Sequence, residues 1–338
     1  MKFTNKILIT GGSGFIGSNF CRFMVNKYPN CLFINVDKLS YAGNKDNLKD
    51  IEKRKNYKFF KLDICNYKDF EKIIKSFSPN IIVNFAAETH VDRSILYPDE
   101  FVKTDIIGVH NILDLSRKYK VSKVVHISTD EVYGSIKKGS FSEEDALNPT
   151  SPYSASKASA DLLIMAYYKT YRLPIMIVRP TNNYGPYQFP EKFIPLMITN
   201  ALENKHLPVY GNGMNVRDWL YVEDTVVAID IIIHKGEIGE IYNVSSKNEQ
   251  KNIVVVKKIL SLLKKPFSLI QFTKDRLAHD LRYSVNPTKV YKLGFVPKYN
   301  FETGLKITID WYVNNILWWK KIKNSIQFKK FYNIQYKR

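Results

Sequence analysis

The stretch KILITGGSGFIG, residues 6–17, decides the fold of this 338-residue chain. It begins as a short apolar strand, turns through a run of glycines and then enters a helical pattern. Gly11, Gly14 and Gly17 satisfy G-x-x-G-x-x-G, and Gly12 with the last two satisfies G-x-G-x-x-G. Glycines let the backbone turn tightly and let a pyrophosphate approach a helix N-terminus. The stretch therefore predicts the first βα unit of a dinucleotide-binding fold.

The same alternation of apolar strands and helices continues outward from this stretch. Strands are predicted at Lys6–Thr10, Leu32–Val36, Tyr57–Leu62, Asn80–Phe85, Lys123–Ser128, Ile175–Arg179 and Ile241–Val244. Helices are predicted at Phe15–Tyr28, Tyr67–Phe77, Asp99–Tyr119, Pro152–Tyr171, Val222–Ile233, Ile253–Leu263 and Gly304–Trp318. Continuous Val/Ile-rich strands between helices predict an α/β fold with a Rossmann-type, doubly wound parallel sheet.

After Pro180 the elements become shorter, and Pro, Gly and Asn become frequent. This change predicts a smaller C-terminal α/β substrate-binding lobe. We expect an NAD-binding domain over residues 1–180 and a nucleotide-sugar-binding lobe over 181–318, with the chain crossing between them. Residues 319–338 form a basic tail without an assigned role.

Two carboxylates at strand ends bear on the cofactor. Asp37 ends the second predicted strand, 20 residues after Gly17. A carboxylate there can accept hydrogen bonds from both ribose hydroxyls and would repel a 2′-phosphate, which favours NAD over NADP. Asp63 ends the third strand and either bonds the adenine amino group or caps the strand end.

A second constellation follows the fifth strand, which ends in STDEVYG at residues 128–134. Tyr153 and Lys157 come next, spaced i, i+4 on one face of a predicted helix. We expect the Lys157 ammonium to lower the pKa of Tyr153 toward neutrality, so that the phenol acts as a base. A surface pair is the alternative at this spacing.

Charge and cysteine content exclude several classes of protein. The chain has 51 Lys+Arg and 32 Asp+Glu, a net charge of +19, and residues 311–338 carry seven cations with no acidic residue. The remaining lysines are scattered, which is typical of a solvated surface. Cys21, Cys31 and Cys65 form no CxxC pair, so neither a disulfide framework nor a metal site is indicated. No signal peptide or membrane span is evident, and we expect a cytoplasmic protein.

The motifs resemble the extended short-chain dehydrogenase/reductase superfamily and, within it, the dTDP-glucose 4,6-dehydratases. The matching segments are GGSGFIGS (11–18), NVDKLSYAGN (35–44), NFAAETHVDRSI (84–95), STDEVYG (128–134), SPYSASKAS (151–159), NNYGPYQFPEKFIP (182–195) and RDWLYVEDT (217–225). The resemblance covers about residues 6–315 and implies a tightly bound NAD, a nucleoside diphosphate-sugar substrate such as dTDP-glucose, and a homodimer through the helices at 99–119 and 152–171.

The resemblance also implies site residues. Those for NAD are Gly11, Gly14, Phe15, Ile16, Gly17, Asp37, Lys38, Leu39, Ser40, Asp63, Ile64, Phe85, Ala86, Ala87, Thr104, Tyr153, Lys157 and Asn183. Those for the substrate are Thr89, Thr129, Asn182, Lys192, Phe193, Pro208, Tyr210, Arg217, Asn252, Arg276 and His279. Guanidinium groups suit a diphosphate and aromatic faces suit a pyrimidine.

The implied catalytic residues are Thr129, Asp130, Glu131, Tyr153 and Lys157. The related sugar epimerases carry an uncharged pair after this Ser/Thr, whereas a dehydratase must also move protons at carbons 5 and 6. The Asp130–Glu131 pair supplies an acid and a base for that step. The implied reaction therefore oxidises carbon 4, eliminates water across carbons 5 and 6, and returns hydride to carbon 6.

Three departures from the family pattern are present. The loop at 275–280 reads DRLAHD in place of Asp-Arg-Pro-Gly-His-Asp, which leaves dTDP versus UDP open. Asp105 replaces a common Asn, and Pro180 replaces a Cys of some relatives. The alternatives are a UDP-glucose 4,6-dehydratase, a 4-epimerase, a nucleotide-sensing binding protein on an inactive scaffold, and a cationic nucleic-acid binder, for which no motif is present.

Overall fold

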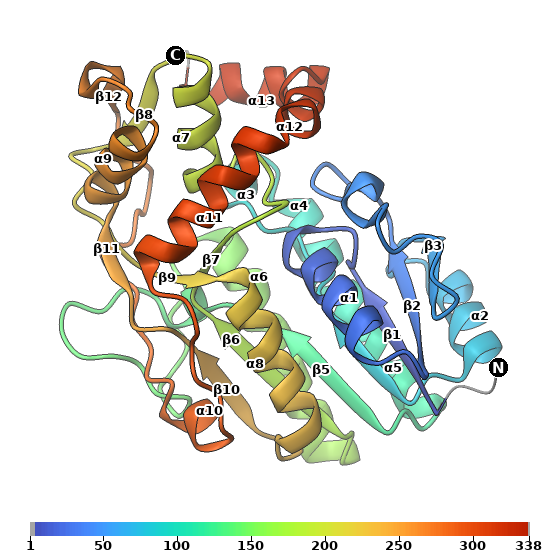
Figure 1. Ribbon diagram of the computed structural model, residues 1–338. Coiled ribbons are helices and arrows are strands. Elements are labelled where there is room, and N and C mark those ends of the chain that lie inside the picture. The colour runs from blue at the N-terminus through green and yellow to red at the C-terminus, as the bar shows by residue number, and fades with distance from the viewer. Residues whose placement is uncertain (1–3, 337–338) are drawn as a thin grey trace.

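Seven parallel strands form the central sheet of the computed structural model, which describes residues 4–336 (Figure 1). Their order is β10-β6-β5-β4-β1-β2-β3. The strands are β1 (Asn5–Thr10), β2 (Cys31–Asp37), β3 (Tyr57–Lys61), β4 (Ile81–Asn84), β5 (Lys123–Ile127), β6 (Ile175–Pro180) and β10 (Ile241–Val244). All seven predicted strands exist, and the Rossmann-type parallel α/β fold is confirmed. The strand order reverses between β1 and β4, where such folds bind their ligands.

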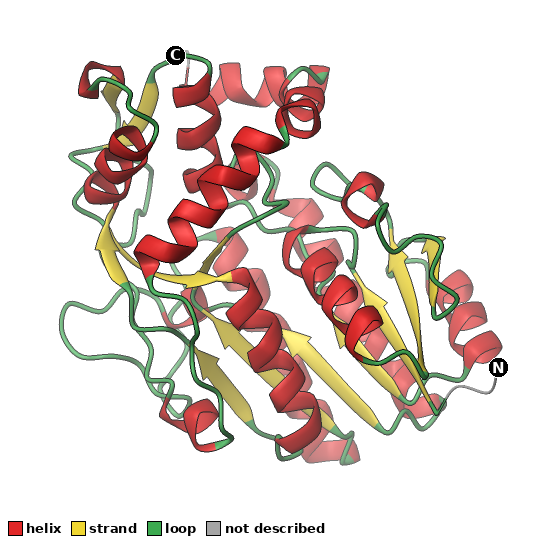
Figure 2. Cartoon of the chain, viewed as in Figure 1, coloured by secondary structure: helices red, strands yellow, loops and turns green. Residues whose placement is uncertain are grey.

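The alternating direction of strand side chains builds a core on each face of the sheet. Ile7 and Ile9 pack toward one face and Leu8 toward the other, and all three are buried. Helices α1 (Phe15–Lys27) and α8 (Val222–Lys235) cover the first face. Helices α2 (Tyr67–Phe77), α5 (Val109–Lys118) and α6 (Pro152–Tyr171) cover the second (Figure 2).

The helix predicted over Asp99–Tyr119 is not continuous. After α3 (Val91–Leu96), it consists of α4 (Pro98–Phe101), a π-helical segment η2 (Val102–Gly108) and α5. The prediction of one regular helix was therefore wrong. π-Helical turns inside helices often occur at functional sites. This one buries Thr104 and Asp105 beside the strand ends.

The second lobe is smaller and lies over the carboxyl ends of the large sheet (Figure 1). Its sheets are β11-β9-β7 and β12-β8, made of β7 (Asn182–Tyr184), β8 (Leu207–Tyr210), β9 (Val216–Tyr221), β11 (Glu249–Lys251) and β12 (Ile270–Thr273). Its main helices are α7 (Phe193–Leu202), α9 (Asn252–Leu262), α11 (Phe301–Asn314), α12 (Ile316–Lys323) and α13 (Ile326–Tyr336). Four short helices complete the described part of the chain. In the first half, η1 (Lys45–Leu48) follows β2 and η3 (Asp130–Tyr133) follows β5, and later in the chain come η4 (Phe267–Leu269) and α10 (Thr288–Lys292). Between these elements, α8 and β10 return the chain to the large sheet.

The C-terminal residues are folded against this lobe. The helix predicted over Gly304–Trp318 is two helices, because Asn315 leaves the helical conformation (φ −120°, ψ 41°) between α11 and α12. Trp319, Phe328 and Phe331 of α12 and α13 are buried. Lys337 and Arg338 of the expected basic tail lie outside the described residues. Over residues 4–336, no helix combines the length and apolarity that crossing a membrane requires.

Candidate active site

The glycine loop between β1 and α1 forms one end of a long cavity. Gly11 has φ +71°, and a Cβ there would lie 2.5 Å from the backbone N of Ala86. A Cβ on Gly17 would collide with the carbonyl oxygen of Gly11. Gly14 precedes α1 and gives its first turn no side-chain cap. The helix N–H groups therefore remain available to a phosphate, as a dinucleotide requires.

Asp37 extends this end of the cavity. Its carboxylate accepts hydrogen bonds from Ser13 N (2.9 Å) and Leu39 N (2.7 Å). Burial raises its pKa, and these two N–H groups oppose that shift. Asp63 also lines the cavity and accepts a hydrogen bond from Cys65 N (2.9 Å), so it also caps the strand end. A tight glycine loop, an uncapped helix and a fixed carboxylate fit the pyrophosphate and ribose of NAD.

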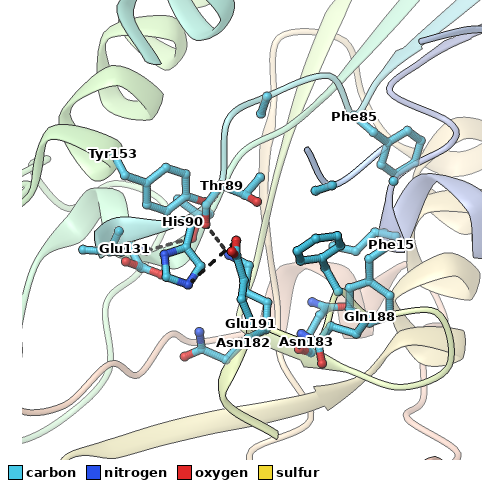
Figure 3. A pocket seen from close by; sticks show the side chains of 18 of the residues that line it. Phe15, Phe85, Thr89, His90, Glu131, Tyr153, Asn182, Asn183, Gln188 and Glu191 are labelled. Carbon is cyan, nitrogen blue, oxygen red and sulfur yellow. Dashed lines mark hydrogen bonds and ion pairs between the residues drawn. The ribbon is translucent and has the colours of Figure 1, made fainter. Parts of the chain in front are cut away.

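Tyr153 and Glu131 face the middle of the cavity (Figure 3), and Thr129 also lines it. Thr129 is the N-cap of η3, and its hydroxyl accepts a hydrogen bond from Glu131 N (3.3 Å). Tyr153 lies in the first turn of α6, which Ser151 begins with a capping box. Strand β5 and helix α6 therefore bring these three side chains together from neighbouring backbone ends.

Lys157 lies one turn further along α6 and is buried. Its Nζ donates to the carbonyl oxygen of Ile127 (2.8 Å) and lies 3.4 Å from His126 Nε2. Burial lowers its pKa, and the carboxylate of Asp105 opposes that shift. Asp105 itself is held by Glu88 N (2.9 Å) and by the Ser156 hydroxyl (2.7 Å). Lys157 is thus fixed between the end of β5 and a buried carboxyl group.

The pKa of Tyr153 differs from the expectation. Burial raises it well above its usual value, the carboxylates of Glu131 and Asp105 add to the shift, and a hydrogen bond with Thr129 opposes it. The ammonium of Lys157 bonds a backbone carbonyl oxygen in place of the phenol. In this geometry Tyr153 holds its proton, and the expected lowering by Lys157 is not found.

Asp130 and Glu131 occupy different environments although they are adjacent. Asp130 is buried behind the cavity wall, where its Oδ1 accepts a hydrogen bond from Thr129 Oγ1 (3.3 Å) and its Oδ2 has no partner among the described residues. Burial raises the pKa of Asp130 well above its usual range, and Glu131 and Asp218 add to the shift. Burial also raises the pKa of Glu131, but the cations of Arg217, Lys192 and Arg276 oppose it. Burial thus favours the protonated form of both carboxyl groups, and three cations act against it at Glu131.

Cationic side chains surround the far end of the cavity. Arg276 donates to both carboxylate oxygens of Asp92 (2.6 and 3.1 Å). Arg217 donates to the carbonyl oxygen of Asp280 (3.0 Å) and lies over the Tyr283 ring. Such guanidinium groups suit a diphosphate. The ammonium of Lys192 donates to a backbone carbonyl oxygen of the loop after β4.

Most residues expected at the site line this one cavity. Those of the cofactor set are Gly11, Gly14, Phe15, Ile16, Gly17, Asp37, Lys38, Ser40, Asp63, Ile64, Phe85, Ala86, Ala87, Thr104, Tyr153, Lys157 and Asn183. Those of the substrate set are Thr89, Thr129, Asn182, Lys192, Phe193, Pro208, Tyr210, Arg217, Asn252, Arg276 and His279. Two expected residues do not line it. Leu39 contributes its N–H to Asp37, and Asp130 lies behind Thr129.

Sequence reasoning missed several polar and aromatic residues of the cavity. They are His90, Asp92, Gln188, Glu191, Trp219, Tyr283 and Tyr336. Burial lowers the pKa of His90 to about 4, so this imidazole is neutral near pH 7. His90, Asp92 and Glu191 fall inside motif segments, which was the available signal. Tyr336 lies outside every motif, and nothing in the sequence pointed to it.

Comparison with known proteins gives consistent matches. A family model described as GDP-mannose 4,6 dehydratase matches residues 8–308. A probable dTDP-glucose 4,6-dehydratase of Sinorhizobium fredii is 45% identical over 95% of this chain and 96% of its own. The dTDP-glucose 4,6-dehydratase of Bacillus anthracis, solved in complex with NAD, is 50% identical with a TM-score of 0.89, over 95% of this chain and 100% of its own. The corresponding Streptomyces venezuelae enzyme, also solved with NAD, is 41% identical with a TM-score of 0.92, over 94% and 100%.

Proposed function

The chain belongs to the GDP-mannose 4,6 dehydratase family, and from this membership we propose that it is an NAD-dependent dTDP-glucose 4,6-dehydratase. It would convert dTDP-glucose to dTDP-4-keto-6-deoxyglucose and water. The observation that carries the proposal is the meeting of Tyr153 and Glu131 in one cavity, with Asp130 buried beside them. An epimerase also oxidises carbon 4, so the acid–base pair beside the oxidation site is what separates a dehydratase from an epimerase.

The oxidation step is assigned to Tyr153, which must first lose the proton that burial favours. The positive charge of the oxidised cofactor would favour the phenolate, and the phenolate oxygen would then accept the proton of the carbon-4 hydroxyl. Thr129 lines the cavity with that phenol and would help to orient the substrate, and Lys157 holds the adjacent end of β5 in place. NAD, when bound, accepts a hydride from carbon 4 and returns it to carbon 6. The residues that would hold it are the glycine loop, Asp37 and Lys157. Because the hydride returns within one turnover, the cofactor stays bound.

The elimination step is assigned to the neighbouring carboxyl groups. The ketone at carbon 4 acidifies the hydrogen on carbon 5, and Glu131 removes it as a proton. Burial raises the pKa of Asp130 well above its usual range, and Glu131 and Asp218 add to the shift, so Asp130 is assigned as the acid. Because Asp130 lies behind Thr129, the Thr129 hydroxyl, which lines the cavity, would pass a proton to the carbon-6 hydroxyl as water leaves and take the proton of Asp130 in its place. Glu131 then returns its proton to carbon 5.

The test is to incubate the protein with dTDP-glucose or UDP-glucose and to measure the absorbance that a 4-keto-6-deoxy sugar develops in strong alkali. We expect dTDP-glucose to give the signal, together with a product mass lower by one water. An isomer of unchanged mass would identify an epimerase, and a signal with UDP-glucose alone would identify the other nucleotide. Binding without turnover would identify a nucleotide sensor.

We further propose a cytoplasmic homodimer. The cytoplasmic assignment is supported by three unpaired cysteines, which suit a reducing compartment. The dimer is supported by exposed apolar side chains on α3, η2 and α6, among them Val102, Ile107 and Leu162, the last with 64% of its surface exposed. Such a patch on adjacent helices suits a self-complementary interface.

A further inference from the structure

The last two helices, α12 and α13, lie beyond residue 308, where the family match ends. We call them the C-terminal helix pair. Trp319 of α12 is buried in the core of the second lobe, and Tyr332 and Tyr336 of α13 pack against that core. The pair is therefore a fixed part of the lobe.

Helix α12 reaches across to the cofactor half. Its Trp318 Nε1 donates to Asn47 Oδ1 (3.0 Å), and Asn47 Nδ2 donates to the carbonyl oxygen of Ser13 in the glycine loop (3.0 Å). Lys321 forms an ion pair with Asp46 beside it (2.6 Å). One amide side chain thus joins the helix pair to the loop that fits a pyrophosphate.

Helix α13 closes the opposite end of the cavity. Tyr336 lines the cavity, and its ring is stacked on that of Tyr210 with centroids 6.0 Å apart. Gln335 Nε2 donates to the hydroxyl oxygen of Tyr210 (2.6 Å). Earlier in the helix, Phe331 lies under the guanidinium of Arg93, which is 4.1 Å from the ring centroid. The last turn of α13 therefore lines the cavity with Tyr336 and, through Gln335, fixes the position of Tyr210, which also lines it.

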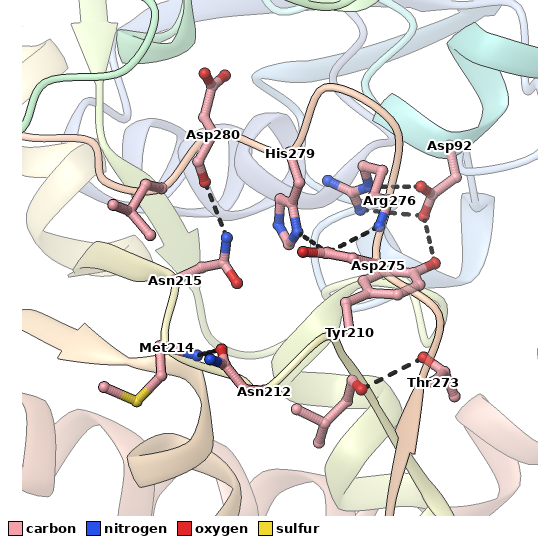
Figure 4. A network of polar contacts seen from close by, with 12 residues as sticks. Asp92, Tyr210, Asn212, Met214, Asn215, Thr273, Asp275, Arg276, His279 and Asp280 are labelled. Carbon is pink, nitrogen blue, oxygen red and sulfur yellow. Dashed lines mark hydrogen bonds and ion pairs between the residues drawn. The ribbon is translucent and has the colours of Figure 1, made fainter.

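Hydrogen bonds connect Tyr210 through Asp92 to Arg276, a cation of the expected substrate site (Figure 4). The Tyr210 hydroxyl donates to Asp92 Oδ2 (3.2 Å), and the two carboxylate oxygens of Asp92 also accept hydrogen bonds from the Arg276 guanidinium. Gln335, Tyr210, Asp92 and Arg276 thus form one hydrogen-bonded series. A change in Gln335 alters the support of the guanidinium expected at the diphosphate.

We propose that the C-terminal helix pair is part of the nucleotide-sugar site, in which Tyr336 offers a face to the nucleoside and Gln335 positions Tyr210 and, through Asp92, Arg276. The proposal rests on the proposed function, which places a nucleoside diphosphate at this end of the cavity. It gives the segment a role in holding the nucleotide, separate from the proton transfers at Tyr153 and Glu131. Stacking on an aromatic face suits any base, so Tyr336 contributes affinity and Gln335 contributes orientation.

The test uses the full chain with the variants Tyr336→Leu, Tyr336→Phe and Gln335→Leu. Gln327→Leu is the matched control, because Gln327 is exposed in the first turn of the same helix. Dissociation constants for dTDP and UDP are measured by calorimetry, and KM and kcat for dTDP-glucose by product formation. We expect Tyr336→Leu and Gln335→Leu to weaken dTDP binding by about tenfold, and KM to rise more than kcat falls. Tyr336→Phe should retain the binding of the parent, and Gln327→Leu should match the parent in every measurement.

Unchanged dTDP binding in both Leu variants would overturn the proposal, as would a fall in kcat at constant KM. A loss of binding in Gln327→Leu as well would show that α13 acts only through folding. Failure of the proposed function gives a different result, since the parent would then bind dTDP without dehydrating dTDP-glucose, while the binding differences among the variants would still be measured.

Discussion

Two adjacent carboxyl groups, Asp130 and Glu131, lie in different surroundings, and Glu131 is the residue on which the proposed elimination depends. We expect Glu131→Gln to lower dehydration by about 10²–10⁴-fold, because the amide keeps the size of the side chain and removes the base. Its melting temperature should stay near that of the parent.

Turnover of the Glu131→Gln variant is measured with dTDP-glucose, and deuterium uptake at carbon 5 is measured in heavy water. The exposed Glu144→Gln is the control. Near-normal turnover, or continued exchange at carbon 5, would remove Glu131 from this role.

Asp105 gives a prediction about pH. Burial raises its pKa to about 6 from 3.8, although Lys157 opposes the shift. Below about pH 4 the group is protonated in both the folded and the unfolded chain. Above pH 6 it is charged in both, and the folded state bears the cost of the buried charge. A pKa of about 6 in place of 3.8 corresponds to a cost of about 3 kcal/mol to the folded state once the group is charged.

We therefore expect the stability of Asp105→Asn relative to the parent to rise by up to about 3 kcal/mol between pH 4 and pH 7. An amide can satisfy the same partners, since its oxygen accepts from Glu88 N and its NH₂ can donate to the Ser156 hydroxyl. Denaturant unfolding at a series of pH values measures the difference, with the exposed Asp310→Asn as the control. A difference that does not change with pH would contradict the prediction.

At the scale of the element, the glycine loop and the first turn of α1 have no room for a side chain at Gly17. A methyl group there would meet the carbonyl oxygen of Gly11, so Gly17→Ala must move α1 away from the loop. We expect the purified variant to retain far less NAD than the parent, measured as nucleotide released on denaturation. Gly139→Ala is the control, because a Cβ there meets nothing within 4 Å and costs only about 1 kcal/mol of backbone strain at φ +78°. Equal cofactor content in Gly17→Ala and the parent would contradict the assignment of this loop.

At the scale of the whole molecule, the exposed apolar face on η2 and α6 predicts a self-associating surface. Leu162→Asp places a charge in the middle of this face without touching the cavity. We expect the parent to sediment as a dimer and the variant as a monomer at micromolar concentration, because an unpaired buried charge costs several kcal/mol. Lys169→Asp, on the same helix, is the control for added negative charge. A variant that remains dimeric would place the interface elsewhere.

At this scale, several of the cations behind the net charge of +19 have identifiable partners. Lys321 pairs with Asp46 (2.6 Å) and Lys323 with Glu203 (2.6 Å), so part of the basic C-terminal segment joins that segment to the rest of the molecule. Arg217, Arg276 and Lys192 surround the cavity, where an anionic diphosphate fits. These cations therefore have partners or a proposed ligand that do not require nucleic acid.

The sequence by itself determined the parallel sheet, the cofactor loop and the meeting of Tyr153 with the end of β5. These features follow from local patterns, since periodicity sets the face of a strand or helix and parallel strands bring their carboxyl ends to one edge. The sequence did not show the π-helical η2, the break at Asn315 or the burial of Asp130 behind Thr129, because each depends on packing against distant residues.

Only the tertiary structure decided which residues far apart in sequence share the end of the cavity at which we propose that the nucleotide binds. Asp92 meets Arg276 across 184 positions, and Tyr210 meets Gln335 across 125. The periodicity of the sequence does not reveal such pairs, because the packing of two lobes around one cavity brings them together. For the same reason the C-terminal segment, whose composition suggested a basic tail, proved to be a helix pair that lines the site. The sequence determined the elements and their chemistry, and packing decided which side chains act together.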